Sequence, residues 1–241
     1  MLKALIFDVD GTLADTESAH LAAFNHAFAE LGFDWHWDTA LYTRLLAVSG
    51  GKERIKAHWQ SQATDIKDIG VGGLEDTIAQ LHDIKTAAYE QAVKDGAVQM
   101  RPGVLDLLCS AGAQGLQLAI ATTTSPVNIA ALLRKALGAD WKAHFSVVED
   151  ASTAPRKKPD PMVYTQTLSR LGLQARHCLA FEDSENGLRA AMGAGLATVV
   201  TPNDFTAAHD FTGALRTLPH LQGVGVAQLR EWHQSAFMDK A

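Results

Sequence analysis

The sequence lacks three features, and each absence argues against a class of protein. It has no apolar run close to the roughly 20 residues that a membrane-spanning helix needs. It has only two cysteines, Cys109 and Cys178, which lie in apolar stretches without metal-ligand spacing, so we expect two buried thiols. Its ten histidines form neither an HExxH motif nor a His/Cys cluster, which disfavours a zinc site.

Basic residues are fewer than acidic ones: the sequence has 21 Lys and Arg and 27 Asp and Glu, which gives a formal net charge of −6. Nonspecific binding to nucleic acid relies on a broad basic face, so this balance argues against it. The apolar start, residues 2–7, runs too quickly into Asp8 and Asp10 to be a secretory signal. We therefore expect a cytoplasmic protein without membrane or nucleic-acid partners, and we take it to be a monomer.

The chain has 241 residues, of which 47% are hydrophobic and 20% charged, as in ordinary globular proteins. This length suits one large domain or a core with a smaller insert. Residues 2–9 form a short apolar run that ends in acid and Gly11, the pattern of a buried strand followed by a loop. Residues 16–93 are different, because they show helical spacing and loops without a convincing strand.

From Pro102 onward, strand-like runs alternate with amphipathic helices. Strands are predicted at residues 116–121, 145–148, 178–181 and 197–201. Helices are predicted at residues 104–111, 129–137, 162–171 and 187–192, several closed by a glycine, at Gly112, Gly138, Gly172 and Gly193. This alternation predicts a parallel sheet covered on both faces, which the first strand should join. The fold class is therefore α/β, with a Rossmann-like core at residues 1–15 and 94–241 and an inserted helical domain at residues 16–93.

Polar side chains follow three of the predicted strands. The first strand ends in residues 8–12 (DVDGT), another is followed by residues 122–125 (TTTS), and a third by residues 182–184 (EDS). A compact basic group, residues 155–159 (PRKKP), lies in a fourth loop. Ligands of open parallel sheets bind beyond the carboxyl ends of the strands. Carboxylates that face a lysine and hydroxyls suit Mg²⁺ and a phosphoryl group.

These segments resemble the four ordered motifs of the haloacid dehalogenase superfamily, and the helical insert resembles its C1 cap. Within that superfamily the chain is most similar to CbbY-type phosphatases. The segments that carry this similarity are residues 7–13, 50–55, 122–125, 181–184 and 187–191. The resemblance implies a Mg²⁺-dependent phosphatase of the haloacid dehalogenase fold that acts on a small phosphorylated sugar.

The resemblance also implies roles for the acidic residues. Asp8 would attack phosphorus and form an aspartyl-phosphate that water then hydrolyses. Asp10, two residues along an extended chain, lies on the same side as Asp8 and would protonate the leaving alcohol and then deprotonate the water. Magnesium would bind Asp8, the carbonyl of Asp10 and Asp183. Glu182 would bind the metal through water or support Asp183.

Phosphoryl oxygens would be held by Thr122 and Lys158. The backbone amide of Thr123 is a candidate further donor, and the alternative is that Thr123 and Thr124 only pack against or cap the helix that follows. Lys157 is more simply explained as a solvated neighbour of Lys158.

Six residues of the insert are expected to bind substrate, namely Glu17, Tyr42, Gly50, Gly51, Lys52 and Arg54. Gly50 and Gly51 would let backbone amides approach a second phosphate, and Lys52 would supply the charge. Arg54 has an equally good structural interpretation, as a partner of Glu53 or of a neighbouring acid.

CbbY-type phosphatases act on xylulose 1,5-bisphosphate, an inhibitor of Rubisco, so the resemblance implies this substrate and a role in carbon fixation.

The alternative function is that of a β-phosphoglucomutase-like isomerase, which would also retain Asp15 and His20. The sequence departs from the mutase pattern at residues 50–52 (GGK), where the mutase has a Ser-Arg pair, and at residues 122–124 (TTT), where it has Ser-Ala-Ser. Asp10 argues against dehalogenases, which lack this acid, and against phosphonate hydrolases, which replace it with alanine. A noncatalytic sensor of a phosphorylated ligand is a third class of function, but such a protein would have lost catalytic residues, and all four motifs are intact here.

Overall fold

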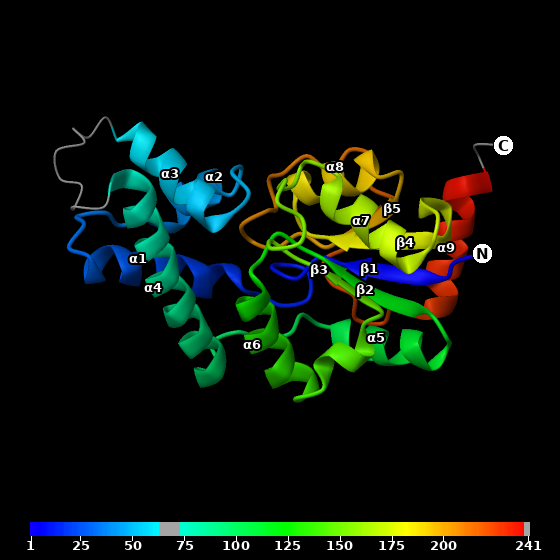
Figure 1. Ribbon diagram of the computed structural model, residues 1–241. Coiled ribbons are helices and arrows are strands. Elements are labelled where there is room, and N and C mark those ends of the chain that lie inside the picture. The colour runs from blue at the N-terminus through cyan, green and yellow to red at the C-terminus, as the bar shows by residue number, and fades with distance from the viewer. Residues whose placement is uncertain (63–72, 239–241) are drawn as a thin grey trace. The chain divides into compact units, whose positions relative to one another are not determined.

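The computed structural model describes residues 1–62 and 73–238, and the chain divides into two compact units (Figure 1). The first unit comprises residues 1–15 and 99–241, and the second comprises residues 16–98. The last helix of the second unit runs through Asp95, and the unit itself runs through Val98, whereas the helical insert was expected to end at Val93.

The first unit is built on one six-stranded sheet in which every neighbouring pair is parallel. The strand order is β3-β2-β1-β4-β5-β6. The strands are β1 (Ala4–Phe7), β2 (Gln117–Ala121), β3 (Val147–Glu149), β4 (Cys178–Glu182), β5 (Ala197–Val200) and β6 (Arg216–Thr217). The first five lie where strands were predicted. The sixth was not predicted, because it is two exposed residues long and has no apolar run.

The register of the three central strands brings their carboxyl ends level. Phe7 pairs with Ile120 on one side and with Phe181 on the other, and the rings of Phe7 and Phe181 stack with centroids 4.5 Å apart. All residues of β1 are buried, as expected for a strand covered on both faces. Residues that follow β1, β2 and β4 therefore emerge at one edge of the sheet.

Helices cover both faces of the sheet (Figure 1). On one face α7 packs against β2, β3 and α8, and on the other α5 packs against β2 and α9. The helices are α5 (Val104–Ala113), α6 (Pro126–Leu137), α7 (Met162–Leu171), α8 (Glu185–Gly193) and α9 (Val226–Met238), with short 3-10 turns at Trp141–His144 and Ala175–His177.

Two of the four predicted glycine stops are correct and two are shifted. Gly138 and Gly172 end α6 and α7 with φ of 90° and 64°, values that glycine adopts at little cost. Gly112 lies inside α5, and the positive φ of 76° falls on Gly115 instead. Gly193 is the last residue of α8, where Gly195 takes the positive φ. In both helices a second glycine follows closely, and the later one makes the turn.

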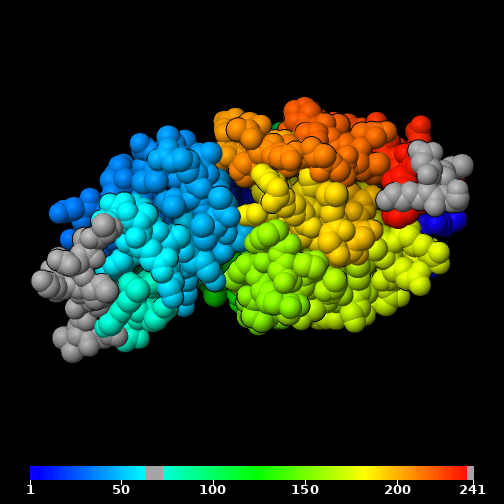
Figure 2. Space-filling view, turned by 90° about the horizontal axis from the view of Figure 1, so that it is seen from above, coloured from blue at the N-terminus to red at the C-terminus, as the bar shows by residue number. Residues whose placement is uncertain are grey.

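The segment after β5 lies on the surface of the first unit, against α8 (orange and yellow in Figure 2). There the Glu185 amide donates to His209 Nδ1, and the Asp210 amide donates to the Glu185 carboxylate.

The prediction of two buried thiols is correct for Cys178, which is buried. It is wrong for Cys109, which is exposed because it lies on the face of α5 that is turned to solvent. Among the described residues no helix is both long enough and apolar enough to cross a bilayer.

The described part of the second unit contains helices and no strand, as predicted. Its helices are α1 (Glu17–Glu30), α2 (Thr39–Leu45), α3 (Gly51–Ser61) and α4 (Gly73–Asp95). Aromatic rings fill its interior: Trp37 lies with its ring centroid 4.8 Å from those of Phe24 and Phe28, and all three side chains are buried. Such ring pairs add stability beyond their buried area.

The two stretches of chain that lead into and out of the second unit pair with each other. Ala14 and Met100 form an antiparallel bridge. The Asp15 amide donates to the Gln99 carbonyl at 3.0 Å, and the Arg101 amide donates to the Leu13 carbonyl at 2.9 Å. Arg101 is thereby placed beside the turn that follows β1.

Candidate functional site

The turn after β1 places Asp8 at the carboxyl edge of the sheet. The Asp8 amide continues the sheet by donating to the Phe181 carbonyl at 3.0 Å, and its side chain is buried. The chain then closes tightly, with the Leu13 amide donating to the Val9 carbonyl at 2.9 Å. Gly11 has φ of 75°, and a Cβ there would overlap the Asp183 carboxylate. Glycine is therefore required at this position by both conformation and space.

Lys158 joins Asp8 to Glu182. Its Nζ lies 2.6 Å from Asp8 Oδ1 and 2.6 Å from Glu182 Oε1. The side chains of Lys158, Asp8 and Glu182 are only 5%, 9% and 0% exposed, so water screens this network poorly. Lys158 and Asp8, both predicted site residues, therefore lie in contact, and Glu182 contacts Lys158, a partner that its predicted roles did not include.

Tyr164 on α7 is the fourth member of this network. Its hydroxyl donates a short hydrogen bond to Glu182 Oε1, and Lys158 Nζ lies 5.3 Å from the centre of its ring. Gly187 on α8 leaves room for Glu182, since a Cβ at that position would overlap the carboxylate. The Glu182 side chain is thus fixed by packing as well as by charge.

Burial and neighbouring charges together set the pKa values of this network. The pKa of Asp8 is raised to about 7, chiefly by burial; the charge of Lys158 opposes this rise and the charge of Glu182 adds to it. Burial alone would lower the pKa of Lys158, but the attraction of Asp8 and Glu182 exceeds this effect and raises it above its usual range. Burial, with the neighbouring charge of Glu182, also raises the pKa of Tyr164. Lys158 is therefore cationic, and a further cation beside Asp8 would favour the ionised form of its carboxyl group.

The donor set fits a hard divalent cation. Carboxylate oxygens of Asp8, Glu182 and Asp183 all lie within 4.8 Å of one another, and all three residues are buried. Glu182 Oε2 is buried and accepts no hydrogen bond from any residue that the structure describes. Three carboxylates with one lysine leave an excess of negative charge, and Mg²⁺ prefers such oxygens.

Asp10 and the threonines lie at the same edge. The Thr124 hydroxyl donates a short hydrogen bond to Asp10 Oδ2. Thr122 is buried, its amide donates to the Glu149 carbonyl at 3.1 Å, and its hydroxyl accepts from the Thr124 amide at 3.3 Å. Thr123 lies between them and is half-buried. The turn after β2 thus presents hydroxyls and amides beside Asp10.

Three residues that contact this site were missed by sequence reasoning. Tyr164 and Arg101 carry no pattern that marks them. Asn203, whose Nδ2 donates to Asp183 Oδ2 at 2.8 Å, follows β5 by three residues, and its place after a predicted strand was an available signal.

The residues expected to bind substrate from the insert lie in the second unit. The Tyr42 hydroxyl donates to Glu17 Oε2 at 2.7 Å and accepts from Arg54 Nη1 at 3.1 Å. Arg54 also donates to the carbonyls of Leu45 and Val48, and its guanidinium lies 5.1 Å from the centre of the Tyr42 ring. Arg54 therefore satisfies carbonyl groups at and just after the end of α2, which agrees with a structural role. The partners are these carbonyls and Tyr42, whereas the expected partner was Glu53 or another acid.

The other three insert residues surround the start of α3. Gly50 precedes the helix with φ of 100°, and Lys52 lies exposed in the first turn. A Cβ on Gly51 would meet the His82 ring at 2.9 Å, so a glycine lets α3 approach α4 here. The pKa of His82 is lowered to about 4, chiefly by burial and also by the charges of Lys85 and Lys52.

Known proteins resemble this chain in both sequence and fold. The haloacid dehalogenase-like hydrolase family matches residues 2–195. The plasmid CbbY protein of Cupriavidus necator is 50% identical over 254 residues, covering 99% of each chain. The crystal structure of CbbY from Rhodobacter sphaeroides in complex with phosphate is 41% identical with a TM-score of 0.88, and the match covers 95% of this chain and 100% of that one. A mutant of that protein in complex with xylulose-(1,5)bisphosphate is 40% identical with the same TM-score, covering 95% and 99%.

Proposed function

Because the chain belongs to the haloacid dehalogenase-like hydrolases, and within them to the CbbY proteins, we propose that it releases inorganic phosphate from xylulose 1,5-bisphosphate through an aspartyl-phosphate on Asp8. The observation that carries this proposal is the buried contact of Asp8 with Lys158 beside Asp183, at an edge where Asp10 is also held. A nucleophile, an acid and a cation for the phosphoryl oxygens are then all supplied by one edge of the sheet.

In the first step an Asp8 oxygen attacks phosphorus, and the bond from phosphorus to the sugar oxygen breaks. Asp10, in its protonated form, gives its proton to that sugar oxygen, so the product leaves as a neutral alcohol. The Thr124 hydroxyl donates to Asp10 Oδ2 and so holds the Asp10 carboxyl at this edge of the sheet. Lys158 neutralises the equatorial oxygens of the phosphoryl group as charge moves during transfer.

In the second step Asp10, now ionised, takes a proton from water, and the water oxygen attacks phosphorus. The bond between phosphorus and the Asp8 oxygen breaks, which restores the Asp8 carboxylate and releases phosphate. Asp10 returns to its protonated state, so protons and charges balance over the cycle.

Magnesium, held by Asp8, Asp183 and the Asp10 carbonyl, would reduce the repulsion between the Asp8 carboxylate and an anionic phosphate. Glu182 Oε1 is already engaged by Lys158 and Tyr164, which favours support of Lys158 over direct ligation for that oxygen. Removal of metal with a chelator should stop phosphate release, and added Mg²⁺ should restore it. Full activity after exhaustive metal removal would contradict the metal assignment.

The second phosphate of a bisphosphate requires its own cation, and we assign this role to Lys52 with the amides at Gly50 and Gly51. Lys52 is exposed in the first turn of α3, where the helix N-terminus adds partial positive charge. Glu17 and Tyr42 are held together by the hydrogen bond between them, and they would contact the sugar hydroxyls.

A phosphate-release screen tests this function. Xylulose 1,5-bisphosphate should give the highest kcat/KM, ahead of ribulose 1,5-bisphosphate and β-glucose 1-phosphate. Conversion of β-glucose 1-phosphate to its 6-phosphate without phosphate release would instead indicate a mutase. A cytoplasmic location and a monomeric state stay predictions, and light scattering of the purified protein would test the second.

A further inference from the structure

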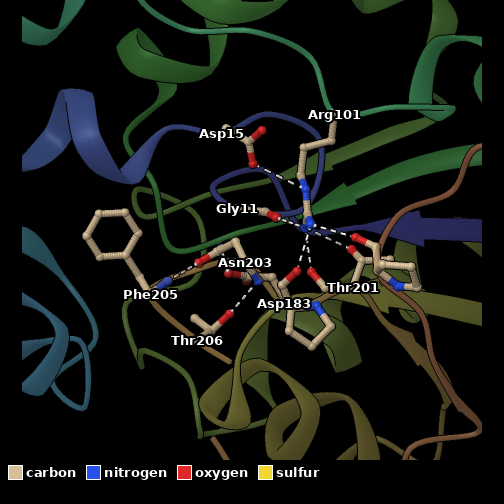
Figure 3. Close-up of polar contacts among 10 residues, drawn as sticks. Gly11, Asp15, Arg101, Asp183, Thr201, Asn203, Phe205 and Thr206 are labelled. Atoms are coloured by element: carbon tan, nitrogen blue, oxygen red, sulfur yellow. Dashed lines mark hydrogen bonds and ion pairs between the residues drawn. The ribbon is translucent and has the colours of Figure 1, made fainter. Parts of the chain in front are cut away.

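The Asp183 carboxylate is held by an asparagine from a loop that no motif of the sequence marks. Asn203 lies three residues after β5, and its Nδ2 donates to Asp183 Oδ2 at 2.8 Å (Figure 3). A hydrogen bond to one carboxylate oxygen fixes the plane of the carboxylate and therefore the direction of its other oxygen. Residues that orient a metal ligand in this way affect metal affinity strongly.

The Asn203 side chain is itself held in one orientation. Its Oδ1 accepts from the Phe205 amide at 2.9 Å, so the nitrogen must be the end that faces Asp183. The Asn203 amide donates to Thr206 Oγ1, and the Thr206 amide donates to the Asn203 carbonyl, both at 3.0 Å. The turn at residues 203–206 is thus closed by three hydrogen bonds and presents one donor to Asp183 (Figure 3).

Arg101 anchors the loop that carries this turn. Its buried guanidinium donates to the Thr201 carbonyl, to the Pro202 carbonyl at 2.7 Å and to the Pro219 carbonyl at 3.1 Å. It also donates to the Gly11 carbonyl at 2.5 Å, and its Nε lies 3.3 Å from Asp15 Oδ1. One side chain therefore ties the turn after β1 to the loop after β5 (Figure 3).

The turn after β1 and the loop after β5 both pack closely against Asp183. A Cβ on Gly11 would lie 2.6 Å from Asp183 Cγ and 2.7 Å from Asn203 Nδ2. A shift of either segment would therefore move Asp183 relative to Asp8 and to the Asp10 carbonyl. Lysine could not replace the guanidinium in this role, because a single ammonium has three donors and no planar fork.

We propose that Asn203 is a positioning residue that sets the orientation of Asp183 for the divalent cation, and that Arg101 acts through Asn203 by holding its loop against the Gly11 turn. This inference rests on the magnesium site of the proposed function. Neither residue touches the substrate in this scheme. Both act on the affinity for the metal, and the chemical step at saturating metal is left largely intact.

The primary test is a calorimetric titration of the purified protein with MgCl₂, without substrate. Asn203→Ala should raise the Kd for Mg²⁺ by about 10–100-fold, the range for a lost partner of a metal ligand. The Mg²⁺ concentration for half-maximal phosphate release should rise by the same factor, while kcat at saturating Mg²⁺ should change by less than about threefold.

A matched control separates this effect from loss of the local turn. Asp210, in the same loop, makes an equivalent turn in which its Oδ1 accepts from the Thr212 amide at 2.9 Å, while its own amide donates to the Glu185 carboxylate. Asp210→Ala should leave the Kd for Mg²⁺ unchanged. An unchanged Kd in Asn203→Ala, or an equal rise in both variants, would overturn the role of Asn203.

Arg101 is tested by a double-variant cycle. Arg101→Lys should also weaken Mg²⁺ binding, and in Asn203→Ala/Arg101→Lys the two effects should be less than additive, because Arg101 acts through Asn203. Arg170→Lys is the control, since Arg170 forms a half-exposed ion pair with Glu149 in the same unit and should leave the Kd unchanged. Full additivity would overturn the Arg101 part.

If Arg101→Lys does not fold, the Asn203→Ala titration still decides the role of Asn203, and the increase in Tm on adding Mg²⁺ to Arg101→Gln then tests Arg101. An increase equal to that of the wild type would overturn its role. Absence of Mg²⁺ binding in the wild type would instead overturn the metal site of the proposed function, so the two failures are distinguishable.

Discussion

The two units of the molecule hold their polar groups in different ways. In the first unit the sheet register fixes Asp8 and Glu182, and Lys158 is buried between them. In the second unit aromatic rings form the interior, and Lys52 lies exposed on the first turn of a helix. The first arrangement can place reacting atoms precisely but tolerates little change. The second can change its contacts to substrate without disturbing its packing, so we expect substitutions in the first unit to affect chemistry and those in the second to affect selectivity.

The largest effect should follow the loss of the nucleophile. Asp8→Asn keeps the shape of the side chain but cannot form the acyl-phosphate, so kcat should fall on the order of 10⁴-fold or more. Steady-state phosphate release measures this. Asp150→Asn is the control, because Asp150 is a buried acid of the same edge whose Oδ1 only accepts from Ser152, as an amide oxygen also would. Substantial turnover by folded Asp8→Asn would end the covalent mechanism.

The next effect should depend on the leaving group. Asp10→Asn removes the acid that protonates the sugar oxygen, so its first turnover on a sugar phosphate should slow by about 10²–10⁴-fold. With 4-nitrophenyl phosphate the first turnover should slow far less, since nitrophenolate leaves without a proton. Rapid-quench measurement of the first turnover compares the two. Equal losses on both substrates would show that Asp10 is not the acid.

A smaller and selective effect is expected in the second unit. Lys52→Ala should lose roughly 1.5–3 kcal/mol of transition-state binding on a bisphosphate, the range for a charge-assisted hydrogen bond, and much less on a monophosphate. The ratio of the two kcat/KM values measures this. Lys56→Ala is the matched control on the same helix, where Lys56 forms an exposed ion pair with Glu75 at 2.6 Å. If Lys52→Ala lowers both kcat/KM values equally, Lys52 does not bind the distal phosphate.

The smallest effect concerns pH and the buried acid. Because the pKa of Asp8 is raised to about 7, a proton occupies its carboxylate below that pH and competes with the cation. The apparent affinity for Mg²⁺ should therefore fall by up to about tenfold for each pH unit below 7 and level off above it, as expected for one proton. Calorimetric titrations across this range measure it. Asp8→Asn should show no such dependence, and a dependence that persists there would assign the proton to another group.

The sequence by itself determined the strand ends and the residues that follow them. The apolar runs before Asp8, Thr122 and Glu182 predict buried strands, and parallel strands necessarily bring their carboxyl ends to one edge. The helical nature of the insert also followed from sequence, because its apolar residues recur at three- and four-residue intervals. The shifted stops at Gly112 and Gly193 show the limit of this reasoning, since a glycine ends a helix only where the chain must turn.

Only the tertiary structure decided which partners these residues have. Lys158 meets Glu182 from a different loop, Asn203 reaches Asp183, and Arg101 binds carbonyls of residues about a hundred positions away. Every residue has a carbonyl, so a side chain that binds carbonyls leaves no pattern in the sequence of its partners. Such contacts depend on how distant loops approach in the folded chain, whereas periodicity records only neighbours along one element.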